Sequence, residues 1–304
     1  MLKGVGTKFD KALSLGAIVF TSTIIKEVPS DGVMFQLRLL ESLQSKPYSL
    51  LPNASSAAKA REPSAKFNPF LPYDEKLYVD TLNGTHNILF NKYCIVRDHL
   101  LITTRDFQNQ YNPLTESDFK SILDVMDSMS NSLAFFNCGH MSGASVLHKH
   151  IQVIPVDSHG VPMEVLVNAM ESLHPAAKPF QIPSIPFAHA AVFIPPSIDA
   201  KTLTVIYRET LLAAFKNSGQ DYSPYLNPTD PTIETPEPLP PSYAFLMTRR
   251  WMLIVPRREE SWNGISVNSV GFSGMVFVKR AEDYDAVTRL GMFNLLKELT
   301  YPKL

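Results

Sequence analysis

The sequence predicts an α+β protein in which a mainly antiparallel sheet is flanked by helices. Extended segments rich in β-branched and aliphatic residues outnumber the segments with helical periodicity. Several extended segments are joined by connections too short for a parallel crossover. No internal repeat is present, and the excess of strands and these short connections favour this class over a doubly wound parallel sheet.

The composition excludes some classes of partner. The chain has 304 residues, of which 45% are hydrophobic, and its formal net charge is -1. A chain of this length can bury a sizeable core, but its net charge creates no global field for nucleic acid or an anionic membrane. Cys94 and Cys138 are too few for a disulfide framework, which fits a reducing compartment. We therefore expect a cytoplasmic or nuclear protein.

The N-terminal region contains an apolar run at residues 13–25, preceded by Lys3, Lys8 and Lys11. The run is shorter than the roughly 20 residues needed to span a bilayer. It contains several Ser and Thr residues, and no small-residue cleavage pattern follows it. We expect a buried helix here rather than a signal peptide.

The remaining elements follow from local periodicity and turn residues. An Ala- and Ser-rich linker is expected at residues 51–66. Strands are expected at residues 77–82, 88–96, 99–104, 134–137, 146–156, 187–194, 243–256 and 274–279. Thr115 begins a helix that extends to about residue 133, because Glu116 and Asp118 occupy its first turn. Further helices are expected at residues 201–215 and 292–299. These elements divide into an N-terminal and catalytic half, residues 1–182, and a C-terminal half, residues 183–304, which completes the substrate site within one compact unit.

Residues 217–241 contain seven prolines. Such density excludes helix and central strand, because proline lacks the backbone donor that both need. A loop of this length is usually functional or disordered, and the sequence leaves its role open.

The segment with the clearest chemistry is residues 136–152, FNCGHMSGASVLHKHIQ. Side chains alternate between the faces of a strand, so His148, His150 and Gln152 share one face. Leu147, Ile151 and Val153 share the other face with the stem of Lys149. Three polar side chains in a row on one face are costly unless a ligand or another polar group meets them.

This pattern suits attack on phosphorus. The neutral imidazole of His150 can form a covalent intermediate, provided that a hydrogen bond from the strand backbone or from His148 fixes its other ring nitrogen. Gln152 offers an amide donor to a phosphate oxygen. The small residues Gly143, Ala144 and Ser145 allow backbone amides to approach an anion closely, and nucleotidyl transfer needs mainly such positioning and charge neutralisation.

Other interpretations remain open at this point. A His-x-His pair alone can bind metal or lie on the surface, and Cys138, His140 and His159 are available as further zinc ligands. The chain has no Walker motif and no dinucleotide fingerprint.

The segment His148 to Gln152 resembles the His-x-His-x-Gln signature of the transferase branch of the histidine triad superfamily. The chain is also similar to the fungal diadenosine tetraphosphate (Ap4A) phosphorylases, or ATP adenylyltransferases, from about residue 46 to residue 279. The matching segments include residues 45–47, 67–72, 91–92, 142–145, 243–248, 268–269 and 274–279. The resemblance implies a histidine-triad/galactose-1-phosphate uridylyltransferase-like fold.

The resemblance also implies roles for individual residues. His150 would be the nucleophile that takes AMP, with His148 and Gln152 beside it. The residues expected to bind substrate are Lys46, Asn91, Lys92, Asn137, Gly143, Ala144, Ser145, Val146, Asn268, Ser269, Val270, Met275 and Lys279. No metal site and no covalent cofactor are implied, although Mg²⁺ can assist by neutralising the polyphosphate.

The implied reaction is the reversible phosphorolysis of Ap4A to ATP and ADP through an AMP–histidine intermediate, with adenylylsulfate as a further AMP donor. The expected partners are small-molecule nucleotides and orthophosphate, bound by a monomer or homodimer. The alternatives are a related uridylyltransferase, a dinucleoside polyphosphate hydrolase, a nucleotide-binding sensor without activity, and a metal-binding structural domain.

Overall fold

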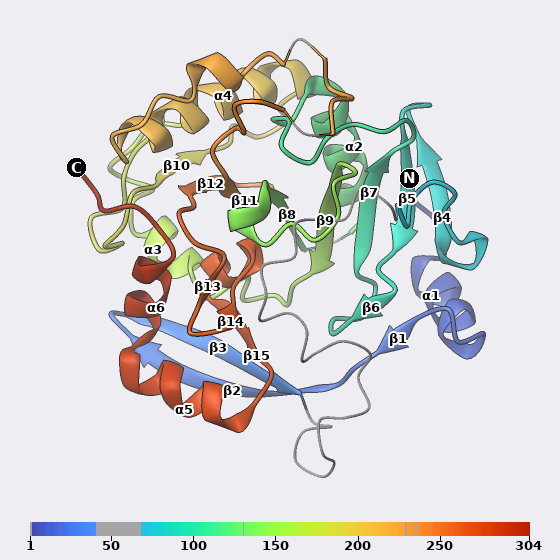
Figure 1. Ribbon diagram of the computed structural model, residues 1–304, viewed down its shortest axis with the longest axis horizontal. Helices are drawn as coiled ribbons and strands as arrows, with labels where there is room; N and C mark the ends of the chain where they lie inside the picture. Colours follow the sequence, from blue (N-terminus) through green and yellow to red (C-terminus); the bar gives the residue numbers. More distant parts are fainter. Residues whose placement is uncertain (1, 41–67, 130, 229, 235) are drawn as a thin grey trace.

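A single eight-stranded antiparallel sheet forms the centre of the molecule (Figure 1). The computed structural model describes residues 2–40, 68–129, 131–228, 230–234 and 236–304. Across the sheet, the strands are β10 Ala190–Phe193, β12 Trp251–Pro256, β11 Tyr243–Met247, β8 Ser132–Cys138, β9 His150–Pro155, β7 Leu100–Thr104, β5 His86–Phe90 and β4 Tyr78–Leu82. The predicted α+β class is confirmed. Both predicted halves contribute strands to this sheet, since β10, β11 and β12 come from the C-terminal half, residues 183–304.

Two helices cover one face of this sheet, α2 at Glu116–Met126 and α4 at Ala200–Lys216 (Figure 1). Their apolar side chains, such as Phe119 and Tyr207, pack with Ile151 and other strand residues in one buried cluster, which α1 at Val5–Ser14 extends. The predicted start of α2 is confirmed, since Thr115 forms a capping box with Asp118. The predicted helix at residues 201–215 corresponds to α4.

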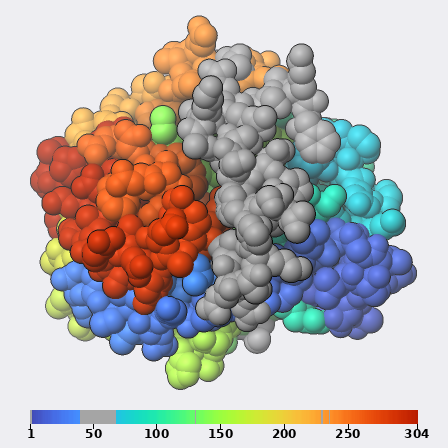
Figure 2. All heavy atoms as spheres, turned by 60° about the horizontal axis from the view of Figure 1, so that its bottom comes forward, coloured from blue at the N-terminus to red at the C-terminus, as the bar shows by residue number. Residues whose placement is uncertain are grey.

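A three-stranded sheet and a helix cover the other face. Its strands are β2 Thr23–Ser30, β3 Val33–Leu40 and β15 Met275–Val278, in the order β15-β3-β2. The parallel pairing of β3 with β15 places an early segment of the chain beside a late one, as the adjacent blue and red segments of Figure 2 show. Phe35, Leu37 and Val276 pack against the central sheet together with Leu296 of α6, Met292–Glu298.

The remaining elements are short. They are β1 Val19–Phe20, β6 Tyr93–Cys94, β13 Ser261–Trp262, β14 Ile265–Ser266, α3 Glu164–Asn168, α5 Ala281–Leu290 and the 3-10 turns Glu75–Leu77, His140–Ser142, Ser223–Tyr225 and Ser269–Ser273. β1 pairs in parallel with β6, and β13 pairs with β14. Within the described part of the chain, no helix is both long and apolar enough to cross a membrane.

The buried helix expected at residues 13–25 is wrong. α1 ends at Ser14, and residues 19–20 and 23–25 lie in the strands β1 and β2. Its apolar residues are largely exposed, Val19 at 47% and Ile25 at 46%. The β-branched residues of this run favour extended backbone, and β3 is available as the partner strand of β2.

Several predicted boundaries also shift. The helix predicted to reach residue 133 ends at Met126, because Ser132 and Leu133 are buried in β8. The strand predicted from residue 146 begins at His150, and the one predicted at residues 243–256 is the hairpin of β11 and β12. The described residues of the Pro-rich loop contain no α-helix or strand, as predicted. The linker expected at residues 51–66 lies outside the described residues.

Candidate active site

His150 begins β9, and its imidazole is held in one orientation. The ring Nδ1 donates a hydrogen bond to the backbone carbonyl of His148, at 2.9 Å. The strand backbone, not the ring of His148, therefore fixes the second ring nitrogen of His150. Burial lowers the pKa of His150 to about 4, against the opposing effect of that hydrogen bond. The ring is consequently neutral near pH 7 and carries its free lone pair on Nε2, to which no described residue forms a hydrogen bond.

His148 is fully engaged with its surroundings. Its Nε2 donates to the carbonyl of Thr104 at 2.8 Å, and its Nδ1 accepts from the amide of Asn68 at 3.0 Å. Asn68 is oriented in turn, because its Oδ1 accepts from the backbone amide of Phe70. The Phe70 ring packs 5.6 Å from the His148 ring and 5.3 Å from the His150 ring. His148 therefore fixes the entry of β9, and Asn68 and Phe70 are site residues that residue-type reasoning had not singled out.

Gln110 ties β9 to the neighbouring strand. Its Oε1 accepts from the amide of His150 at 2.8 Å, and its Nε2 donates to the carbonyls of His150 and Asn137. The paired register of β8 and β9 ends at Phe135 and Gln152. Gln110 thus provides hydrogen bonds between the two strands beyond the point where their backbones stop pairing. It comes from an irregular segment, so local sequence gave no signal for it.

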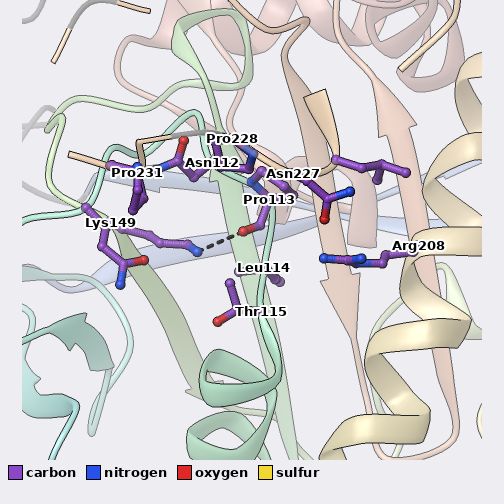
Figure 3. Close-up of a pocket in the computed structure, with 11 residues that line it drawn as sticks. Asn112, Pro113, Leu114, Thr115, Lys149, Arg208, Asn227, Pro228 and Pro231 are labelled. Atoms are coloured by element: carbon purple, nitrogen blue, oxygen red, sulfur yellow. Dashed lines mark hydrogen bonds between the residues drawn. The ribbon is translucent and has the colours of Figure 1, made fainter. Parts of the chain in front are cut away.

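Lys149 points to the opposite face of the strand, as predicted for the core side. Its side chain is fully buried, and Nζ donates to the Pro113 carbonyl at 2.8 Å and to Asp118 at 2.7 Å. Figure 3 shows Lys149 reaching the Pro113 carbonyl beside a cavity of about 270 Å³. This cavity shares no lining residue with the one beside Gln152. We therefore place the candidate active site on the side of His150 and Gln152.

A cavity of about 320 Å³ adjoins β9 on that side. Seven of the predicted site residues line it: Asn91, Gly143, Gln152, Asn268, Val270, Met275 and Lys279. They come from both halves of the chain, so the structure brings together residues that the sequence separates by up to 188 positions (279 − 91). Lys279 lies exposed at the end of β15, where it can meet an anion that enters the cavity.

Gly143 allows the loop before the strand to approach the C-terminal half. Its φ of 87° is in the left-handed region, which disfavours side chains. A Cβ atom at this position would lie 3.0 Å from Cβ of Asn268. Only glycine meets both conditions, and the close approach forms part of the cavity wall.

Arg38 is a second cation in the cavity, and the sequence did not predict it. It belongs to β3, beside β15, and its Nε is buried with no hydrogen-bond partner among the described residues. Burial lowers the pKa of the guanidinium. The alternation of buried Val33, Phe35 and Leu37 was the available signal, since it marks a strand with Arg38 on the opposite face.

Other predicted residues lie elsewhere. Asn137 and Ser269 are buried and bonded to each other, with the Ser269 amide donating to Asn137 Oδ1 at 2.9 Å. Lys92 is exposed, and its Nζ lies 5.8 Å from the ring of Tyr93. The residues outside the cavity lining also include His148, His150, Ala144, Ser145 and Val146; His150 is on the same strand as Gln152, two residues before it. Lys46 lies outside the described residues.

Cys138, a residue named for the metal-binding alternative, is engaged elsewhere. Cys138 is buried, and its thiol donates to the carbonyl of Tyr111 at 3.4 Å. In the described ranges, no three His, Cys, Asp or Glu side chains gather as a metal would require.

Comparison with known proteins identifies relatives along the whole chain. A model described as the Ap4A phosphorylase N-terminal domain matches residues 1–169, and one described as the ATP adenylyltransferase C-terminal domain matches residues 183–302. The chain is 30% identical to diadenosine 5',5'''-P1,P4-tetraphosphate phosphorylase 2 of Saccharomyces cerevisiae, over 92% of this chain and 88% of the relative. Protein APA1 of the same yeast is 25% identical over 93% of this chain and 88% of the relative.

A solved structure agrees with these matches. The crystal structure of the yeast Ap4A phosphorylase Apa2 has a TM-score of 0.77 at 25% identity and covers 100% of both chains. Crystal structures of the same yeast protein also exist in complex with AMP and with Ap4A. The chain therefore belongs to the family of Ap4A phosphorylases and ATP adenylyltransferases, which are nucleotidyltransferase enzymes.

Proposed function

We propose that this enzyme phosphorolyses Ap4A by covalent catalysis at His150. Nε2 of His150 attacks the α-phosphorus in line, the bond to the bridging oxygen breaks, and ATP leaves with the electron pair. An oxygen of orthophosphate then attacks the phosphorus of the AMP–His150 adduct, the P–N bond breaks, and ADP is released. The sequence is reversible, and adenylylsulfate can supply AMP by the same first step.

The observation that carries this proposal is the state of His150. A neutral ring with one nitrogen held by a backbone carbonyl and the other free is poised for nucleophilic attack. The family membership of the chain supports the choice of a dinucleotide as substrate.

The charges around the cavity suit a polyphosphate. A tetraphosphate bridge carries about four negative charges, and Arg38 and Lys279 provide cations at the cavity. A divalent cation would enter with the polyphosphate as part of the substrate complex. The two free cysteines are buried, which supports a reducing setting such as the cytoplasm.

Orthophosphate is expected to be required for Ap4A breakdown. Gln152 cannot act as a general base toward water, because an amide does not take up a proton near pH 7. Orthophosphate is already an anion and needs only a cationic place to bind. Chromatography of the products should show ATP plus ADP when phosphate is present and little release of AMP when it is omitted. Rapid formation of ATP plus AMP without phosphate would make the enzyme a hydrolase, and turnover of UDP-sugars but not Ap4A would make it a uridylyltransferase.

Replacing Lys279 with alanine is expected to raise the KM for Ap4A about three- to tenfold at low ionic strength, with a smaller effect on kcat. The difference from wild type should shrink at high salt, since screening weakens the exposed Lys279 in the wild type as well. Lys297→Ala is the matched control, because this exposed lysine lies on α6 and does not line the cavity. A KM that stays within about twofold of wild type at low salt would exclude Lys279 from substrate binding.

A further inference from the structure

A buried histidine next to Gln152 has no role in the steps above. His99 is 8% exposed and lies immediately before β7. Its Nε2 lies 3.0 Å from Oε1 of Gln152, and its Nδ1 lies 3.3 Å from the side-chain amide of Asn91. Asn91, His99 and Gln152 therefore form a continuous chain of side chains along the wall of the cavity.

The direction of this chain is set at one end by the backbone. The amide of Tyr93 donates to Asn91 Oδ1 at 3.1 Å, which fixes the orientation of the Asn91 amide. The NH₂ group of Asn91 must then face His99, so Nδ1 of His99 is the acceptor. Burial lowers the pKa of His99 to about 4, so the ring is neutral near pH 7. A neutral ring whose Nδ1 accepts carries its proton on Nε2.

The proton on Nε2 of His99 determines how Gln152 is turned. Only the oxygen of the Gln152 amide can accept from it, so Oε1 faces His99. The NH₂ group of Gln152 is left for the cavity, and no described residue accepts a hydrogen bond from it. The opposite orientation would place Nε2–H of His99 against an NH₂ group and would turn an oxygen towards the anionic phosphate.

We propose that His99 is a positioning residue that selects the donor-facing orientation of Gln152, and that Asn91 acts through His99 in this way. The inference rests on the proposed function, because it explains how the amide of Gln152 faces the reacting phosphate. It assigns Asn91 a role in orienting the site, where the family resemblance implied only substrate binding.

The tautomer of His99 gives a test that needs no turnover. ¹⁵N NMR of histidine-labelled protein near pH 7 should show the proton of His99 on Nε2. His189 is the matched control, because it is also buried but donates from Nδ1 to the Phe187 carbonyl and accepts at Nε2 from the Ile182 amide. His99→Gln and His189→Gln assign the two signals. A proton on Nδ1 of His99 would overturn the proposal.

Kinetics test the consequence for catalysis. His99→Leu removes both ring nitrogens and should lower kcat roughly 10- to 100-fold with KM nearly unchanged, since a phosphate donor is then often misdirected. His99→Gln restores a donor towards Gln152 and should recover most of kcat. In a Gln152→Leu background, His99→Leu should change kcat less than about threefold, because its target is already gone.

Independent, multiplying effects of the two substitutions would show that His99 does not act through Gln152. The outcomes also separate the two proposals. A wild-type protein that does not turn over Ap4A refutes the proposed function. An active wild type whose His99 carries its proton on Nδ1 refutes only the proposal that His99 orients Gln152.

Discussion

Replacing His150 with asparagine is expected to reduce turnover of Ap4A by roughly 10⁵-fold or more, as the loss of a covalent nucleophile does in other enzymes. Asparagine can keep the donor to the His148 carbonyl that Nδ1 provides, but it lacks the ring nitrogen that attacks phosphorus in the proposed mechanism. The strand should therefore stay in place, and circular dichroism and the melting temperature should remain close to wild type. Steady-state kinetics with Ap4A and phosphate measure the loss.

The adduct itself is a second measurement of the same prediction. Wild-type protein given Ap4A without phosphate should accumulate an adenylyl group that is labile in acid and stable in base, as a phosphoramidate is. Mass spectrometry should place it on His150. His159→Asn, a change of an exposed histidine, should leave both turnover and adduct unchanged. AMP attached to any other residue, or normal turnover in His150→Asn, would refute the assignment.

Replacing Lys149 with methionine is expected to destabilise the fold by about 3–5 kcal/mol, because it removes the cation from a buried ion pair. Asp118 would keep its hydrogen bonds from His86 and Thr115 but would lose the partner 2.7 Å away. Denaturant unfolding near pH 7 measures the loss. Lys120→Met is the control, because Lys120 is an exposed lysine on α2, the helix that carries Asp118. It should change stability by less than about 0.5 kcal/mol.

The pH dependence of this loss has a defined sign. Burial alone would raise the pKa of Asp118, but Lys149 and His86 together hold it well below its usual value. The stabilisation is therefore complete above the ordinary carboxylate pKa of about 4 and is lost as the pH falls towards the lowered folded value. The gap between wild type and Lys149→Met should shrink below about pH 4. Adding Asp118→Asn to Lys149→Met should recover much of the stability at pH 7, and a loss under about 1 kcal/mol in the single variant would contradict the prediction.

Local sequence pattern predicted the parts of the fold that depend on local chemistry. The capping box at Thr115 located α2, and the alternation around His150 correctly separated Gln152, which lines the cavity, from Lys149, which is buried in the core. The apolar run at residues 13–25 misled because its hydrophobicity alone does not distinguish a buried helix from strands that need a distant partner. The strand β3 pairs with β15, and nothing local to either segment indicates that pairing.

The same distinction applies to the site. Residues in recognisable motifs, such as Gln152 and Gly143, were predicted and do line the cavity. Gln110, His99 and Arg38 were not predicted, because their positions depend on which strands lie side by side. Gln110 and His99 each stand alone in segments without a motif, so only the folded arrangement shows their contacts with β9 and Gln152.

The parallel pairing of β3 with β15 has a consequence for how the protein is made. A ribosome adds about 5–20 residues per second, so the more than two hundred residues between these strands delay β15 by tens of seconds after β3 has emerged. During that interval the edge of β3 that will later bind β15 offers open backbone donors and acceptors beside Phe35 and Leu37, which makes it a place where nascent chains can associate with one another. Arg38 and Lys279 line the same cavity, so its wall is complete only after the last part of the chain has been synthesised. The charged Lys26 and Glu27 on the opposite, permanent edge strand protect that side from the start.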